Sequence, residues 1–81
     1  MHDFDWLVGR VHWAHSIARA HGTAESIAEA DERRKDAREV MYLLRSSVSD
    51  MRFLEMQQTL DTLKDTRDLI EREYVIGSRH Q

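Results

Sequence analysis

The fold is decided by residues 53–74, FLEMQQTLDTLKDTRDLIEREY, in which one stripe repeats with the period of a packed helix. The members of the stripe recur at alternating spacings of 3 and 4 residues: Phe53, Met56, Leu60, Leu63, Arg67, Ile70 and Tyr74. This spacing places them on one face of a long helix that packs against another helix at a shallow angle. We call these seven residues the packing seam. The packing seam predicts how the helices pack, and it contains no pattern typical of a catalytic site.

One seam position holds a charge where an apolar residue is expected. Burying the guanidinium of Arg67 is costly unless it is paired. In the interpretation that we favour, its aliphatic stem packs in the seam and its charge reaches solvent. In the alternative, Arg67 pairs with an acidic residue of the facing helix and fixes the register or the oligomeric state.

Composition indicates an almost entirely helical chain. Its 81 residues include no Pro and no Cys, only three Gly, and 33% charged residues. Such a composition is typical of helices. A chain of this size buries a small core and often needs a partner to reach a typical free energy of unfolding. The lack of Cys excludes disulfides and thiolate metal sites. No apolar run approaches the ~20 residues that cross a bilayer, and the N-terminus lacks a signal-peptide pattern. We therefore expect a cytoplasmic protein that does not engage membranes.

The sequence predicts a single helical domain, 1–81. Its helices are expected over 4–21, 24–46 and 50–76, and a tail over 77–81. Asp3 or Asp5 can cap the first helix, and Gly22 is a natural stop. Thr23 can then cap the second helix. The predicted fold is all-α: a small three-helix domain in which the second and third helices form a long antiparallel hairpin, with the N-terminal helix packed against it.

The connection between the second and third helices is the uncertain boundary. Residues 46–50, Ser-Ser-Val-Ser-Asp, favour a break, and Ser47 with Asp50 fits a loose capping box. A single continuous rod is the alternative. The hydrophobic phase favours the break, because in a continuous helix the packing seam lies on a different face from the preceding stripe, which consists of Ala37, Val40, Met41, Leu44 and Val48.

The first helix carries more apolar surface than one face can hold. One stripe consists of Phe4, Leu7, Val8, Val11, Ala14 and Ala18. A second stripe consists of Trp6, Trp13 and Ile17, with Arg10 beside it; we call these four residues the tryptophan face. Both stripes could contact neighbouring helices. Alternatively, the tryptophan face binds a partner, since Trp and Arg are enriched among interface hot spots. We take this face as the candidate partner-binding site.

The third helix has a thinner second stripe on the side opposite the packing seam. It consists of Met51, Leu54, Leu69 and Ile76, and polar residues interrupt it. We expect these residues to contact the core at either end of the helix.

Five histidines raise the question of a metal site. His12 and His15 are three residues apart, whereas helical zinc sites favour a spacing of four with a third ligand nearby. We therefore expect no metal. His15 should lie at the core boundary with a hydrogen-bonded ring, and His2 and His80 should be solvated.

The sequence offers little for catalysis or cofactor binding. The three glycines are far apart, so no phosphate-binding loop is present. No Ser or Thr has a base at a suggestive spacing, and the stripes contain no paired inward carboxylates. We expect no enzyme activity, no catalytic residues and no cofactor.

Charge distribution argues against nucleic-acid binding. The net charge is 0 over residues 1–22, −1 over 23–48 and −2 over 49–81. Basic surfaces are the usual footprint of nucleic-acid binding. Residues 23–30 loosely resemble the first helix of a helix-turn-helix unit, but a mixed charge run follows without a turn. A DNA-associated transcriptional regulator using the second helix is kept as an alternative.

The hydrophobic spacing from Thr23 to Ile76 resembles that of the small helical chaperones of type III secretion needle subunits. The likeness is carried by Phe53, Gln57, Leu63, Leu69 and Ile70. The Trp-rich first helix departs from that family. The resemblance implies a secretion chaperone as another alternative.

The function that the sequence favours is binding of another protein. We expect a small regulatory or inhibitory adaptor, such as an anti-activator or a phage-type inhibitor of a host protein, that presents a helix face to its partner. A homodimer is also expected, because the chain is small, its first helix has two apolar faces and the packing seam is long.

Overall fold

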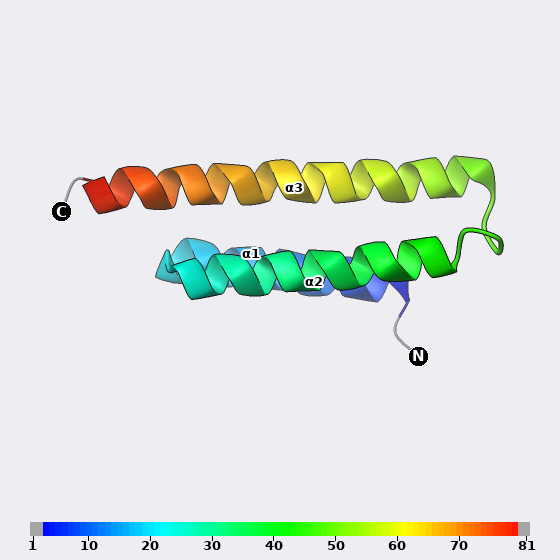
Figure 1. Ribbon diagram of the computed structural model, residues 1–81, viewed down its shortest axis with the longest axis horizontal. Coiled ribbons are helices and arrows are strands. Elements are labelled where there is room, and N and C mark those ends of the chain that lie inside the picture. Colours follow the sequence, from blue (N-terminus) through cyan, green and yellow to red (C-terminus); the bar gives the residue numbers. More distant parts are fainter. Residues whose placement is uncertain (1–2, 80–81) are drawn as a thin grey trace.

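The computed structural model describes residues 3–79, and describes side chains for residues 3–74. It contains three helices, α1 (Phe4–His21), α2 (Ala24–Leu43) and α3 (Asp50–Arg79), and no strand within the described residues (Figure 1). The predicted all-α, three-helix fold is confirmed. The predictions for His2 and His80, and for the side chain of Ile76, concern parts of the chain outside the described residues.

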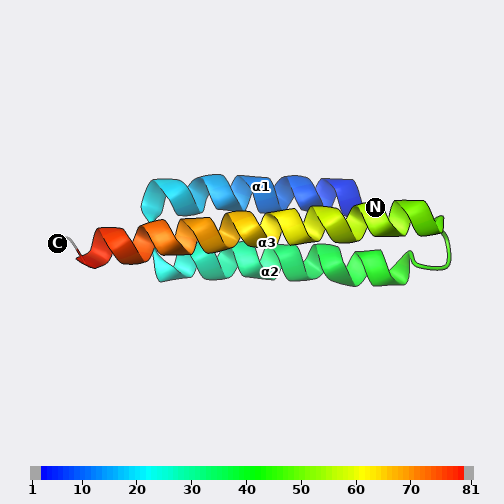
Figure 2. The same cartoon turned by 90° about the horizontal axis from the view of Figure 1, so that it is seen from above.

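The helices run up, down and up along one long axis, giving a bundle of 49 × 22 × 14 Å. α2 is antiparallel to both α1 and α3 (Figure 1). α1 and α2 pack most closely, and α3 lies over the line along which they meet (Figure 2). The C-terminal part of α3 extends past the turn between α1 and α2. The first helix thus lies alongside the α2–α3 hairpin and leaves its outward side to solvent.

Local sequence chemistry sets the boundaries of α1 and the start of α2. Asp3 caps α1, because its Oδ1 accepts a hydrogen bond of 2.8 Å from the backbone N–H of Trp6. Gly22 ends α1 in the left-handed conformation, with φ of 59°, which glycine adopts without strain. Thr23 then caps α2 through a reciprocal capping box with Ser26.

The helix break between α2 and α3 is present, but its details differ from the prediction. α2 ends at Leu43, three residues before the predicted end, because the chain tightens at once into a turn in which the Arg45 N–H bonds the Tyr42 carbonyl at 3.2 Å. Ser49, not Ser47, caps α3: its hydroxyl accepts from the Arg52 N–H at 3.0 Å. The turn is also bridged by Arg45 and Asp50, whose side chains are 3.1 Å apart.

The predicted end of α3 at Ile76 is wrong, since the helix continues through Gly77 to Arg79. A glycine inside a helix costs only about 1 kcal/mol relative to Ala, which is too little to end a long helix without a competing turn. No proline or capping sequence follows Gly77 to supply one.

The core has two parts along the bundle axis. The larger part lies towards the α2–α3 turn and consists of Phe4, Leu7, Val11, Ala37, Met41, Met56, Leu60 and Leu63. The smaller part lies towards the α1–α2 turn and consists of Ala18, Ile27 and Ile70, with Tyr74 packed against it. Four members of the packing seam are buried, namely Met56, Leu60, Leu63 and Ile70, and the other three are half-buried, namely Phe53, Arg67 and Tyr74.

Candidate functional site

The tryptophan face lies on the outer side of α1. Trp13 is 70% exposed, Trp6 43% and Ile17 36%, whereas the opposite stripe of α1 is buried in the core. At 3.6 residues per turn, the face is about a third of a turn around the helix from that buried stripe. Two exposed tryptophans on one helix form an apolar surface that a monomer does not use for its own packing.

A cation–π contact organises the N-terminal part of this face. The guanidinium of Arg10 lies 5.1 Å from the centre of the Trp6 ring. The two residues are one helical turn apart, so the contact follows directly from the helix that Asp3 begins. Such a stack restricts both side chains before any partner binds, and it keeps the positive charge on the same surface as the indoles.

Gly9 lies beside the tryptophan face, and its lack of a side chain leaves open space on the helix surface there. It is exposed in the middle of α1, and a Cβ placed there would meet nothing within 4 Å. Neither a positive φ nor a close contact inside the described part of the chain requires a glycine here.

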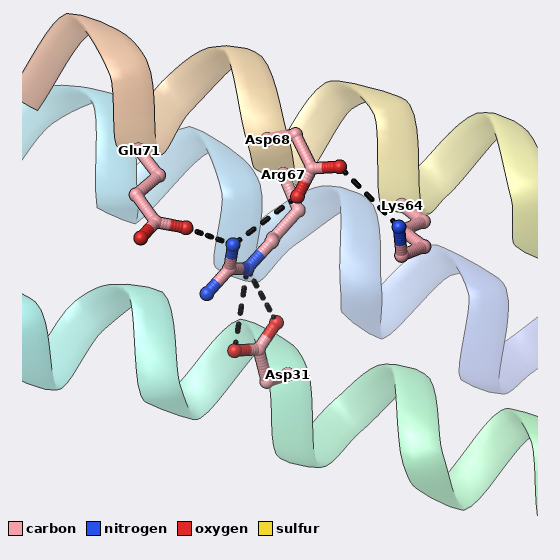
Figure 3. A network of polar contacts seen from close by, with 5 residues as sticks. All are labelled: Asp31, Lys64, Arg67, Asp68 and Glu71. Atoms are coloured by element: carbon pink, nitrogen blue, oxygen red, sulfur yellow. Dashed lines mark hydrogen bonds and ion pairs between the residues drawn. The ribbon is translucent and has the colours of Figure 1, made fainter.

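Arg67 pairs across the helix interface, which contradicts the solvent-reaching interpretation favoured from the sequence. Its Nε donates to both carboxylate oxygens of Asp31 on α2, at 3.0 and 3.3 Å (Figure 3). Its Nη1 donates to Asp68, at 3.1 Å, and to Glu71. The facing-helix alternative therefore describes this residue. The network joins α2 to α3 at one fixed register.

The network also shifts the acid–base equilibria of its members. The hydrogen bond to Asp31 raises the pKa of Arg67 above its ordinary value. Desolvation raises the pKa of Asp68, but the hydrogen bonds from Arg67 and Lys64 outweigh it, so the net pKa lies below its ordinary value. Both shifts stabilise the charged forms, so Arg67 and Asp68 stay ionised at neutral pH.

His15 is more deeply buried than the sequence suggested. It is 3% exposed, and neither ring nitrogen has a hydrogen-bond partner among the described residues. Burial lowers its pKa below the ordinary value of 6.5; the charges of His12, Arg19 and Arg34 lower it further, and Asp31 opposes them. The expected boundary position with a hydrogen-bonded ring is therefore wrong. The helix pattern placed His15 beside the apolar stripe but could not show how closely α2 and α3 enclose it.

Further apolar side chains are exposed near the α2–α3 turn and along α3. They are Tyr42, Leu43, Met51, Leu54 and Leu69. The expectation that Met51, Leu54 and Leu69 contact the core is wrong, because all three are exposed and, among the described residues, none packs against either part of the core.

An open groove of about 640 Å³ runs between α2 and α3. Met41 and Leu60 lie at its base, and its rim carries charges of both signs, including Arg34, Lys35 and Asp61. A rim of mixed sign gives no selective attraction for a polyanion. The groove thus lacks the charge pattern that would identify a ligand class.

The described residues hold no cluster of three or more His, Asp or Glu side chains that could bind a metal ion. Over that same part of the chain, none of the helices combines the length and the apolarity needed to cross a bilayer.

Sequence reasoning missed the residues whose roles depend on how the helices pack. Asp31 lies 36 residues before its partner Arg67, and nothing local marks it. The sequence does show that Gly9 is a glycine inside a predicted helix. Its position beside Trp13 gains meaning only when the tryptophan face is known to be exposed.

Comparison with known proteins adds no family to this description. The sequence matches no protein-family model and no curated protein, and the fold matches no solved structure.

Proposed function

We propose that this chain is a non-enzymatic protein–protein interaction module, a small regulatory or inhibitory adaptor that binds through the tryptophan face of α1. The observation that carries the proposal is the exposure of Trp13, at 70%, on a helix whose other face already completes the core. Large exposed aromatic side chains are rare on monomers and frequent at interface centres.

The composition of the face supports the same function. It joins two indoles, an aliphatic side chain and a guanidinium, which are residue types enriched at protein interfaces. The Arg10–Trp6 stack, with 5.1 Å between guanidinium and ring centre, lowers the entropy that the side chains lose on binding. A helix presented in this way fits the mode in which one helical face contacts a partner.

The alternative DNA-associated function draws no support from the basic residues of α2. Arg33 is paired with Glu29 at 2.7 Å, and the acidic Asp31 lies among these bases and binds Arg67. Bases interleaved with acids do not form the continuous positive surface that duplex DNA requires.

Substitution of Trp13 by Ala tests the proposed function. Removing a central indole should weaken partner binding by about 2 kcal/mol or more while the helix content stays unchanged. The wild-type chain and the variant are each immobilised, and the tagged second copies and the cellular proteins that they retain are quantified separately. Circular dichroism follows folding.

Leu69→Ala is the matched control, because Leu69 is an exposed apolar residue on α3, outside the tryptophan face. It should retain the same proteins as the wild type. If Trp13→Ala unfolds the chain, the indole belongs to the core and the proposed function fails. It also fails if the variant folds and retains everything that the wild type retains.

A further inference from the structure

The tryptophan face is complementary to itself when two copies of α1 run antiparallel. Trp6 and Ile17 lie at equal distances, about 8 Å, on either side of a point between residues 11 and 12. Arg10 and Trp13 lie about 2 Å on either side of that same point. A two-fold axis through this point therefore places Trp6 against Ile17 of the copy and Arg10 level with Trp13 of the copy.

The glycine beside the face fits this arrangement. In the antiparallel pair, the indole of Trp13 projects towards the Gly9–Arg10 segment of the other copy. Gly9 is exposed and a Cβ there would meet nothing within 4 Å, so it leaves room for a projecting ring. Glycine is the least favourable helix residue after proline, and the monomer gives no reason for one here. Contact with a second copy supplies that reason.

The charge on the face suits the same occupant. The guanidinium of Arg10 already stacks on its own Trp6, 5.1 Å from the ring centre. In the antiparallel pair its other side faces Trp13 of the copy, so each guanidinium lies between two indoles. Guanidinium groups are weakly hydrated and stack readily on aromatic rings, which makes this position suitable for the positive charge. Antiparallel helix dipoles add a favourable term.

We propose that the partner of the tryptophan face is a second copy of this chain, bound through α1 in an antiparallel two-fold homodimer. The inference rests on the proposed function, because it names the occupant of that same surface. α1 is about 27 Å long, so the shared strip is smaller than a standard interface and a dissociation constant in the roughly micromolar range is expected.

Gly9→Gln tests the inference by filling the hole. Glutamine is a better helix former than glycine, and its Cβ would meet nothing within 4 Å, so the monomer should be at least as stable as the wild type. The dimer should weaken by about tenfold or more. Light scattering after size exclusion, over a dilution series, should give a mass of twice 9.6 kDa that falls to 9.6 kDa on dilution, and the fall should begin at a concentration about tenfold higher or more for the variant than for the wild type.

Ala28→Gln is the matched control, since Ala28 is a small exposed helix residue on α2 and the variant should dimerise as the wild type does. A wild type that is monomeric at high micromolar concentration overturns the inference, as does a Gly9→Gln variant that dissociates over the same concentration range as the wild type. If the wild type is monomeric while Trp13→Ala still abolishes capture of another protein, the inference fails and the proposed function stands. If Trp13→Ala also changes no capture, both fail.

Cysteine pairing tests the antiparallel orientation separately, because the natural chain has no cysteine. A mixture of Trp6→Cys and Ile17→Cys chains, at concentrations above the dissociation constant, should form disulfide-linked dimers. Each variant alone should form few. Efficient cross-linking of each variant with itself would indicate a parallel pair and would overturn the proposed arrangement.

Discussion

The two halves of the bundle core differ in kind. The half towards the α2–α3 turn is apolar throughout and includes Val11, Met56 and Leu63, all nearly inaccessible to solvent. The half towards the α1–α2 turn holds small side chains such as Ala18, the Arg67 network, and the ring of His15, which has no hydrogen-bond partner within the described chain. The first half stabilises the fold by burying apolar surface. The free energy gained is roughly proportional to the buried apolar area and does not depend on direction. The second half provides directional contacts, which define register.

This difference assigns separate tasks to the two halves. Burial of large apolar side chains should account for most of the folding free energy. A half-buried ion network contributes little net stability, because desolvation offsets most of the attraction, but it penalises pairings that separate the charges. We therefore expect substitutions in the apolar half to change mainly stability, and substitutions in the polar half to change mainly pH dependence and register.

The largest effect should come from breaking the apolar half at Leu63, which is 1% exposed. Leu63→Ala should lower the free energy of unfolding by about 3 kcal/mol, because it removes buried methyl groups and leaves a cavity. Urea unfolding followed by circular dichroism measures the loss. Leu69→Ala, six residues along α3 and exposed, should cost far less. Equal losses for the two variants would contradict the assignment of burial to the packing seam.

The next effect should appear as pH dependence in the polar half. Because burial lowers the pKa of His15 in the folded state, the unfolded chain binds a proton more readily as the pH falls below 6.5. Stability should therefore be unaffected by His15 above this pH and should fall below it, with a slope that approaches about 1.4 kcal/mol per pH unit until the lowered pKa is reached. His15→Leu should remove this contribution.

The measurement is the difference in unfolding free energy between wild type and His15→Leu from pH 7.5 to 5.5, a range above the ordinary titration of carboxylates. Charged neighbours are unchanged in the variant, so the difference isolates the imidazole. A difference that does not vary with pH would mean that the folded ring titrates as it does in the unfolded chain. His15 would then lack the desolvated environment described above.

Much of the fold could be predicted from the sequence because its decisive information is local. Asp3, Gly22 and Thr23 act through bonds within one helical turn, and each sets the boundary expected of its residue type. The packing seam repeats over 22 residues, so its helix and its buried side are recognised without a partner. The sequence favoured Ser47 as the cap of α3, but Ser49 caps the helix in the structure, so the local pattern was insufficient at this boundary.

The candidate site could be predicted only in part, since exposure depends on where neighbouring helices lie. The sequence separated the tryptophan face from the core stripe of α1, but both remained compatible with burial between α2 and α3. The burial of His15 and the pairing of Arg67 with Asp31 likewise depend on the register between helices that are distant in sequence. No local period encodes that register.

The smallest stability effect is expected in the Arg67 network, where a pair of substitutions sharpens the comparison most. Asp31→Asn keeps the shape but removes the charge that faces Arg67, so it should cost about 1 kcal/mol, with Asp68 and Glu71 still compensating the guanidinium. Arg67→Leu restores an apolar packing seam and should leave stability unchanged or raise it, because no charge then remains to be desolvated.

Urea unfolding measures both variants, and the order of their stabilities is the informative result. If Arg67→Leu is less stable than Asp31→Asn, the network contributes net folding energy, and the two halves of the core do not differ as argued. If Arg67→Leu is the more stable variant, loss of the Arg67 network should appear instead as less specific packing of α3 against α2. Without the Arg67–Asp31 contact, only the packing seam defines the register between α2 and α3, and a repeating apolar stripe discriminates weakly between registers. Broadened amide resonances confined to α2 and α3 would reveal exchange between registers, and sharp wild-type-like spectra would assign register to the apolar half alone.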